Sequence, residues 1–409
     1  MNGVTWRPWI VLLGIAMLVV LLPGCRKAPE TVQPPIEDVL PPGGELTPGA
    51  VSGEPLKIGA IFAITGAASS LGEPEANTAK MLEEQINAEG GINGRPLQII
   101  IRDTKGEESE ALTATRELID KENVLALVGP SRSGTTMALI ETVEQAGVPL
   151  ISCAAARAIT DPVKKWVFST PQSDQDAVYR IFEYLQAKGI KKIAAITASG
   201  SFGDEGLKQM EAQAPAAGIK IVAREQFADN DTDMTTQLTR IKGTDAETVI
   251  CWGVGPAPAL IAKNMQQLAM QIPLVMSHGV ANRRFIEGAG DAANGIVLPA
   301  GKLLVAAQLP DDDPHKPLLL QYATQYQDKF GKPADTFGGH AWDGIMLVVK
   351  AMREGALDRA AIRDAIEKTQ GFMGIGGTFN FSPESHYGLN PDAFALVEIV
   401  DGDWKLISE

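Results

Sequence analysis

The chain has 409 residues, of which 45% are hydrophobic and 21% charged, and its formal net charge is −14 at pH 7. This composition is typical of a globular protein, and the length exceeds what one hydrophobic core usually supports, so two lobes are expected. The acidic balance, without any stripe of basic and aromatic residues, argues against a nucleic-acid partner.

Residues 1–24 are typical of a secretory signal. Arg7 precedes an apolar run over 9–22 that is too short to span a bilayer comfortably. The following Leu22-Pro23-Gly24-Cys25 resembles a bacterial lipobox apart from Pro23, and this resemblance implies that Cys25 is lipidated. Residues 25–55 would then be the lipidated cysteine and a flexible Pro- and Gly-rich tether. We therefore expect the protein in the cell envelope, in the periplasm or on the outer face of a membrane; a plain signal peptide with an incidental cysteine is the alternative.

The next part of the chain alternates strand and helix patterns. Apolar runs of strand length occur at 56–64, 97–101, 124–128 and from Leu150 onward, and segments with helical spacing occur at 75–89, 109–121 and 137–146. Strands separated by helices pair in parallel through right-handed crossovers. These residues therefore predict a parallel sheet in an α/β lobe.

The turn between the strand at 124–128 and the following helix is a candidate anion site. Gly129-Pro130 ends the strand, and Ser131 and Ser133 precede the helix. Such a turn places main-chain N–H groups and the positive end of a helix at the edge of a parallel sheet, where a carboxylate or phosphate binds well. The alternative is that both serines only cap the helix.

A similar pattern restarts near residue 175 and predicts a second α/β lobe. Helices are predicted at 175–188, 204–217, 235–241 and 257–268, and strands at 192–197, 220–227, 248–252 and 273–276. Later helices at 339–354 and 358–368, and closing strands at 378–381 and 394–400, follow neither block in order. The chain is therefore expected to pass between the lobes more than once.

Several alternative chemistries lack their motifs in this sequence. A hydrolytic triad of Ser133, His278 and an aspartate would lack the Gly-x-Ser-x-Gly turn around its serine, and residues 129–136 lack the lysine of a phosphate-binding loop. No Cys/His cluster with metal-ligand spacing occurs, and Cys153 and Cys251 adjoin buried strand patterns. We expect two buried thiols, no metal, no cofactor and no enzyme activity.

Four stretches carry a resemblance to a known family: 56–71, 86–97, Gly129-Pro-Ser-Arg-Ser133 and Val148-Pro-Leu-Ile-Ser152. They are similar to the type I periplasmic binding proteins, and the nearest branch is the leucine/isoleucine/valine-binding group of ABC importers. The resemblance implies two Rossmann-like lobes with parallel sheets, joined by a three-segment hinge and closing on a ligand. Lobe 1 would comprise 56–174 plus about 300–375, and lobe 2 would comprise 175–299 plus about 376–409.

The resemblance also implies ligand-binding residues. Ser133, followed by Gly134, falls on the motif serine of the turn that holds the ligand carboxylate, and Ala154 falls on a main-chain ligand. Trp342 falls on an aromatic residue that covers the ligand, and Leu71 stands where a tyrosine often occurs. The carboxylate half of the family's site is therefore expected here.

The half of the site that holds an amino acid's ammonium group differs from the family pattern. Ala156 replaces a threonine, His278 replaces an acidic residue, and Val254 replaces a tyrosine, while Arg157 adds a positive group. A buried ammonium without a carboxylate partner costs several kcal/mol. With Phe202, Trp252, Leu71 and Trp342 available as apolar walls, the sequence predicts an aromatic or branched aliphatic acid without an α-ammonium group.

The resemblance implies a function as well. The protein would be the monomeric binding lipoprotein of a branched-chain-amino-acid-type ABC importer, delivering a small carboxylate to a permease in the inner membrane. Two alternatives remain open on the sequence. One is a binding protein for leucine, isoleucine and valine themselves, and the other is a ligand sensor for a membrane receptor.

Overall fold

The computed structural model describes residues 51–408. The predicted signal segment at 1–24, the predicted lipidation of Cys25 and most of the tether at 25–55 lie outside these residues. Within the described part of the chain, no helix combines the length and the apolar character needed to cross a bilayer.

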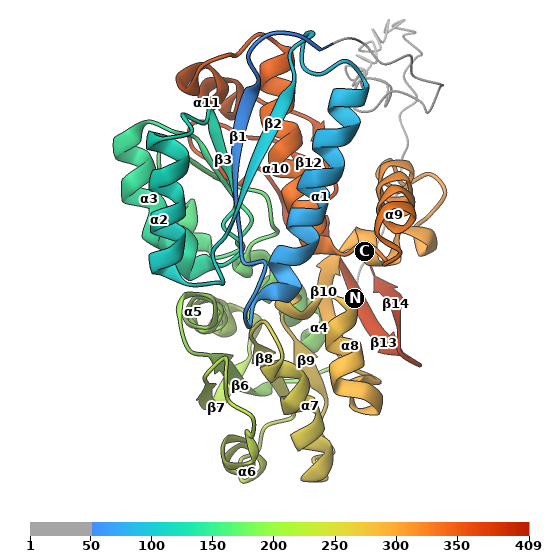
Figure 1. The fold of residues 1–409 in the computed structure, drawn as a ribbon. Helices are drawn as coiled ribbons and strands as arrows, with labels where there is room; N and C mark the ends of the chain where they lie inside the picture. Colours follow the sequence, from blue (N-terminus) through green and yellow to red (C-terminus); the bar gives the residue numbers. More distant parts are fainter. Residues whose placement is uncertain (1–50, 409) are drawn as a thin grey trace, which may run out of the picture. The chain divides into compact units, whose positions relative to one another are not determined.

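The first half of the chain forms a five-stranded parallel sheet (Figure 1). The strand order is β2-β1-β3-β4-β5, with β1 at Leu56–Phe62, β2 at Leu97–Asp103, β3 at Ala126–Val128, β4 at Leu150–Ser152 and β5 at Val167–Ser169. The helices beside it are α1 (Ser69–Ala88), α2 (Glu108–Asp120), α3 (Ser133–Ala146), α10 (Thr336–Arg353) and α11 (Arg359–Glu367). Helix α1 packs against α10, and α2 packs against α3, so helices from late in the chain complete this layer.

The second sheet has seven strands and mixes parallel with antiparallel pairing. Its order is β14-β13-β10-β9-β8-β6-β7, with β6 at Lys192–Ala198, β7 at Lys220–Phe227, β8 at Thr248–Trp252, β9 at Leu274–Met276, β10 at Val297–Gly301, β13 at Phe394–Val400 and β14 at Asp403–Ser408. Strands β13 and β14 run antiparallel to their neighbours. The remaining helices are α4 (Asp174–Ala187), α5 (Ser201–Ala217), α6 (Thr235–Lys242), α7 (Ala257–Gln267), α8 (Arg283–Ala289) and α9 (Lys316–Phe330), and β11 (Phe372–Met373) pairs with β12 (Thr378–Phe379).

Burial explains why these short segments become strands. Every residue of β3, β4 and β8 is buried, as expected for parallel strands covered by helices on both faces. Helices α3 and α5 end at Gly147 and Gly218, whose φ angles of 63° and 66° are the left-handed conformation that glycine tolerates best. The burial of these strands and the glycines at the helix ends therefore favour the same fold.

The structure confirms the predicted α/β class with its parallel-rich sheets, and both Cys153 and Cys251 are free and buried as predicted. Strand β10 and helix α8 were not predicted. Helix α1 begins at Ser69, six residues before its predicted start at 75, because small residues in its first turns carry little periodicity.

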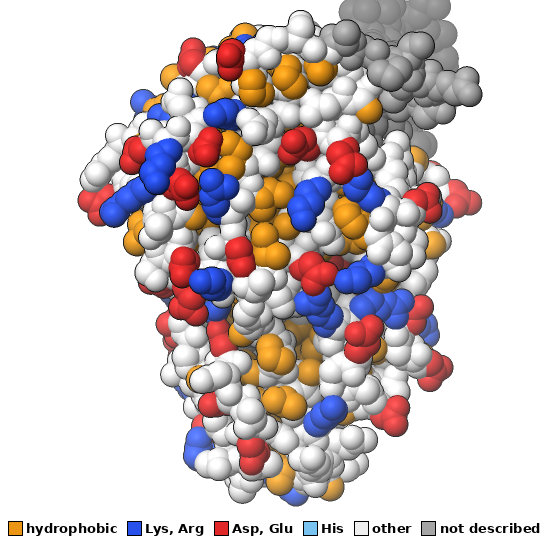
Figure 2. All heavy atoms as spheres, in the orientation of Figure 1, with side chains coloured by type: hydrophobic (Ala, Val, Ile, Leu, Met, Phe, Trp, Pro, Cys, Tyr) orange, Lys and Arg blue, Asp and Glu red, His pale blue; other side chains and the backbone are white. Residues whose placement is uncertain are grey.

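Charged side chains of both signs are mixed on the face of the molecule seen in Figure 2. Lys and Arg side chains alternate there with Asp and Glu side chains over most of the surface. On this face the acidic excess is therefore spread out, and it forms no single-sign patch.

Helix α5 lies close to β8 because it carries a glycine at the point of contact. A β-carbon on Gly206 would overlap the indole ring of Trp252, which is fully buried. The same indole lies edge-on to the imidazole of His278, with 5.7 Å between ring centroids. Gly206 therefore sets the spacing of a wall that reaches the candidate site.

We predict that Gly206→Ala lowers the free energy of unfolding by about 1–3 kcal/mol, because the added methyl group overpacks a rigid ring. Chemical denaturation followed by circular dichroism measures the change. Gly288→Ala in α8 is the matched control: its β-carbon would meet only the methyl group of Ala259 at 3.2 Å. Equal stability of the Gly206→Ala variant and the wild type would contradict the packing described here.

Candidate functional site

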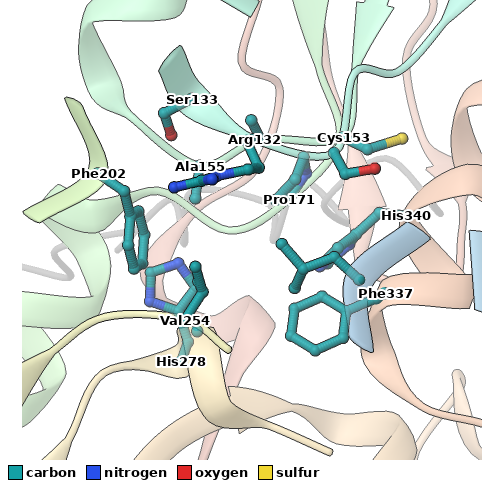
Figure 3. Close-up of a pocket in the computed structure, with 14 residues that line it drawn as sticks. Arg132, Ser133, Cys153, Ala155, Pro171, Phe202, Val254, His278, Phe337 and His340 are labelled. Carbon is teal, nitrogen blue, oxygen red and sulfur yellow. The ribbon is translucent and has the colours of Figure 1, made fainter. Parts of the chain in front are cut away.

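A small cavity lies where loops that follow strands of both sheets meet (Figure 3). About 40 Å³ of it is open to the centres of water molecules, enough for only a few of them. Its lining residues are Leu71, Ser131, Arg132, Ser133, Cys153, Ala154, Ala155, Pro171, Phe202, Val254, His278, Gly279, Phe337 and His340. In open α/β sheets, ligands bind at the carboxyl ends of the strands, which is where most of these residues lie.

The turn that leads into α3 forms one wall of the cavity. The amide of Thr136 donates to the carbonyl of Arg132, whereas the amides of Ser133, Gly134 and Thr135 precede the first intrahelical bond. Three N–H groups and the positive end of the helix dipole are therefore available for an anion beside the cavity.

The two serines of this turn do not cap the helix, so the alternative of simple capping is wrong. The N-cap residue is Arg132, without a side-chain capping bond. The Ser131 hydroxyl accepts from the amide of Ala63 at 3.0 Å and donates to the buried carboxyl of Glu75. The Ser133 hydroxyl accepts from the amide of Ala156 at 3.3 Å. Both hydroxyls thus tie the turn to neighbouring strands and loops.

The opposite walls are mainly apolar. Leu71, Val254 and Phe337 belong to one buried cluster, against which Phe202 packs. Figure 3 shows Phe202 and Val254 on the side of His278, with Phe337 facing them from beside His340. Apolar contacts of this kind suit a branched or aromatic side chain.

Two histidines face the cavity, and burial keeps both imidazoles neutral at physiological pH. Desolvation lowers the pKa of His278 to about 3. Burial also lowers the pKa of His340 to about 3, with a further contribution from His278. The His278 ring is enclosed by Phe202, Trp252 and Phe394, whose centroids lie 5.5–5.7 Å away.

The permanent charge among the residues that line the cavity belongs to an arginine. Among the lining residues in the described part of the chain, Arg132 is the one side chain with a permanent charge, and none is Asp or Glu. Its guanidinium pairs with Asp229, which follows β7 in the second sheet, so this ion pair links segments of the two sheets. Both side chains keep about a quarter of their surface exposed.

The structure brings six of the ten predicted ligand-binding residues to the cavity: Leu71, Ser133, Ala154, Phe202, Val254 and His278. Contact of these six with a ligand stays a prediction. Gly134 lies beside them in an adjoining hollow of about 470 Å³, which also borders Arg132 and Ser133. Ala154 already uses both main-chain groups, because its amide donates to the Ser152 hydroxyl at 3.1 Å and its carbonyl accepts from Ser169 at 3.0 Å.

Three predicted site residues lie away from the cavity. Ala156 is buried in the core of the first sheet, and Arg157 pairs with Asp161 at 3.2 Å while its guanidinium stacks over Tyr387. Trp342 is fully buried, and its ring stacks on Phe372 at 6.3 Å. Contact of Trp342 with a ligand stays a prediction, and in this structure the indole packs in the core.

The aromatic side chain of α10 that does line the cavity is Phe337, five residues before Trp342. Arg132, His340 and Pro171 were not predicted as site residues, although each lines the cavity. A usable signal existed for Pro171, which comes two residues after β5 and thus at the edge of the sheet where the cavity forms. For His340 no local signal distinguishes a cavity residue from a packed one.

Comparison with known proteins identifies the family. A family model described as "Periplasmic binding protein" matches residues 55–403. The chain belongs to this family. It is 24% identical over 375 residues to "Leu/Ile/Val-binding protein homolog 7" of Brucella abortus, covering 84% of this chain and 93% of that protein.

Solved structures support the same assignment for this periplasmic binding protein. An extracellular ligand-binding receptor of Rhodopseudomonas palustris HaA2 superposes with a TM-score of 0.82 at 27% identity, covering 87% of this chain and all of that one. The branched-chain amino acid transporter substrate-binding protein LivJ of Streptococcus pneumoniae, solved with isoleucine, gives 0.77 at 25% identity with the same coverages. The chain is thus a substrate-binding protein of the branched-chain amino acid ABC transporter type, and its family implies a location outside the cytoplasm.

The neutral histidines predict how stability depends on pH. Because the folded pKa of His340 lies below the ordinary value of 6.5, its contribution to stability is fully present above pH 6.5 and is lost as pH falls toward 3. His340→Gln removes this titration. Below pH 6.5 the unfolding free energy of the variant should therefore fall less steeply than that of the wild type, by about 1.4 kcal/mol for each pH unit. Denaturant titrations at pH 7.5, 5.5 and 4.5 measure it; parallel pH profiles for the variant and the wild type would contradict a buried neutral imidazole.

Proposed function

We propose that this protein captures a small carboxylate without an α-ammonium group and delivers it to the permease of an ABC importer. The observation that carries the proposal is the charge of the cavity. Within residues 51–408, the lining contains one guanidinium, two imidazoles and two serine hydroxyls, and no carboxylate.

An amino acid would bind such a cavity poorly. Its ammonium group would leave water without an anionic partner, at a cost of several kcal/mol. The nearest candidate acceptor, His278, is neutral and offers at most one lone pair, which does not compensate a full positive charge. The cost falls on the ammonium group alone, so the 2-oxo analogue of the same amino acid escapes it.

A carboxylate finds three complementary groups in the same place. The amides at the start of α3 and the helix dipole favour negative charge, and the guanidinium of Arg132 lines the same wall. The remainder of the ligand would contact Leu71, Val254 and Phe337. These walls favour a branched aliphatic or aromatic acid.

The small free volume supports a binding cycle with opening and closure. Space for a few water molecules does not hold a ligand of this size, so binding requires the side chains that line the cavity to move apart. The ligand then stabilises the closed form by its contacts with both sides, which is the only energy that closure needs. No bond of the ligand changes.

Hydrophobic amino acids are the second candidate class, because the names of the relatives favour them. The Brucella abortus relative is called a Leu/Ile/Val-binding protein homologue, and the Streptococcus pneumoniae structure holds isoleucine. A role as a ligand sensor would use the same cavity and the same closure.

Matched ligand pairs separate the two ligand classes. We expect 4-methyl-2-oxopentanoate to raise the melting temperature more than leucine, and phenylpyruvate more than phenylalanine, because each pair differs only at the α-ammonium group. At about 100 times its Kd a ligand adds about 2.7 kcal/mol of stability, which a thermal-shift assay resolves. Arg132→Gln should lower the affinity for the oxo acid about tenfold or more. If the amino acids raise the melting temperature strongly and the oxo acids do not, the proposed ligand class is overturned.

We also propose that the protein is held at a membrane through a lipid on Cys25, since the lipobox-like sequence ends there. Cys25→Ser should move the full-length protein from the membrane fraction to the soluble fraction when expressed in a bacterium that processes lipoproteins. Cys251→Ala, which changes a buried thiol in the folded part, should stay with the membranes. Retention of the Cys25→Ser variant in the membrane fraction would exclude this anchor.

A further inference from the structure

Behind His278 lies a buried acid that the proposed binding mode does not use. Asp174, the first residue of α4, is fully buried. Its Oδ1 atom lies 3.7 Å from Nε2 of His278. Within the described residues, neither carboxyl oxygen and neither imidazole nitrogen has a hydrogen-bond partner. Four polar atoms are thus buried side by side without bonds, which is costly unless they serve one another or a ligand.

The surroundings isolate this pair. Three aromatic rings enclose the imidazole, and the indole of Trp252 also faces Asp174. Of the other titratable groups nearby, Glu205 on α5 acts on Asp174, His340 on α10 interacts with His278, and Arg132 lines the same cavity. Glu205 is itself held by Lys208 at 3.1 Å and Gln209 at 2.7 Å.

These surroundings decide where the proton of the pair lies. Burial raises the pKa of Asp174 well above its ordinary value, the charge of Glu205 raises it further, and the Trp252 indole only opposes the shift. Burial lowers the pKa of His278 in turn. Both shifts favour a carboxylic acid beside a neutral imidazole over an ion pair.

The protonation of Asp174 determines which nitrogen of His278 carries hydrogen. A carboxylic acid donates its O–H to Nε2, which leaves the hydrogen of the imidazole on Nδ1. A carboxylate would accept from Nε2–H and leave a lone pair on Nδ1. In the first case Nδ1, which has no protein partner, is a donor, and in the second it is an acceptor. The separation of 3.7 Å is longer than a hydrogen bond, and a small rotation of either side chain closes it.

We infer that Asp174 is a positioning residue for ligand specificity: its protonated carboxyl holds His278 as the Nδ1–H tautomer, which offers a donor to a ligand carboxylate and no acceptor to an ammonium group. The consequence for ligand specificity rests on the proposed function, but the tautomer of His278 does not require a ligand. This role explains why Asp174 is buried next to His278, which stands where the family pattern has an acidic residue.

The tautomer is measured directly by NMR of the protein labelled with ¹⁵N-histidine, without added ligand. The chain has four histidines, so the spectrum is simple, and His278→Asn assigns the signal of interest. We expect a protonated Nδ1 and an unprotonated Nε2 at His278, unchanged between pH 6 and 8. An Nε2–H tautomer at His278 would overturn the inference, whatever the protein binds.

Variants test the consequence for binding. Asp174→Leu removes the donor, and we expect His278 to lose its single tautomer and the affinity for 4-methyl-2-oxopentanoate to fall about tenfold in titration calorimetry. Asp174→Asn keeps an N–H donor and should retain affinity within about threefold. Asp176→Asn, on the same helix but bonded to Ser173 and Tyr387, is the matched control and should bind as the wild type does.

The outcomes separate this inference from the proposed function. Wild-type affinity and an unchanged tautomer in Asp174→Leu would overturn the role of Asp174 while leaving carboxylate binding intact. An Nδ1–H tautomer in a wild-type protein that binds leucine and no oxo acid would instead overturn the proposed ligand class. Should Asp174→Leu fail to fold, the tautomer of the wild type still decides the inference.

Discussion

Desolvation is the constraint on which this site depends. Glu75, Asp174, His278 and His340 are all buried around one small cavity, and burial raises the pKa of the two acids and lowers the pKa of the two imidazoles. Each of these groups is therefore held in its neutral form, where it acts as a hydrogen-bonding group and not as a charge. Among the described lining residues the permanent charge is left to Arg132, which pairs with Asp229, so the proposed preference for anions does not depend on a cluster of cations.

The fold supplies this desolvation through elements that are distant in the chain. The turn before α3 comes from the first sheet, His278 follows β9 of the second, and His340 comes from α10, which packs on α1 late in the sequence. None of these segments could exclude water alone, because each is a loop or a helix end with one exposed side. In this structure these polar groups are buried where loops that follow strands of both sheets meet.

The sequence predicted the sheets better than it predicted the site. Hydrophobic periodicity located most strands and the long helices, because burial on one or two faces leaves a regular pattern. Ser133, Val254 and His278 were predicted from the family resemblance, and all three line the cavity. The side chain of α10 that faces the cavity was not predicted. Trp342 and Phe337 lie on this same helix, and only tertiary packing shows which one faces the cavity. Asp174 had no signal, because its partner lies far away in the chain.

The ion pair between Arg132 and Asp229 limits how the closed form can be held. Its side chains are about a quarter exposed, and pairs of this kind contribute roughly 0–1 kcal/mol. That is too little to favour closure strongly over opening when the cavity holds no ligand. A carboxylate at the start of α3 would share the guanidinium with Asp229 and so contact groups from both sheets at once. In the proposed binding mode the same arginine would serve both recognition and closure, so a ligand without negative charge would lose both affinity and the energy that favours closing.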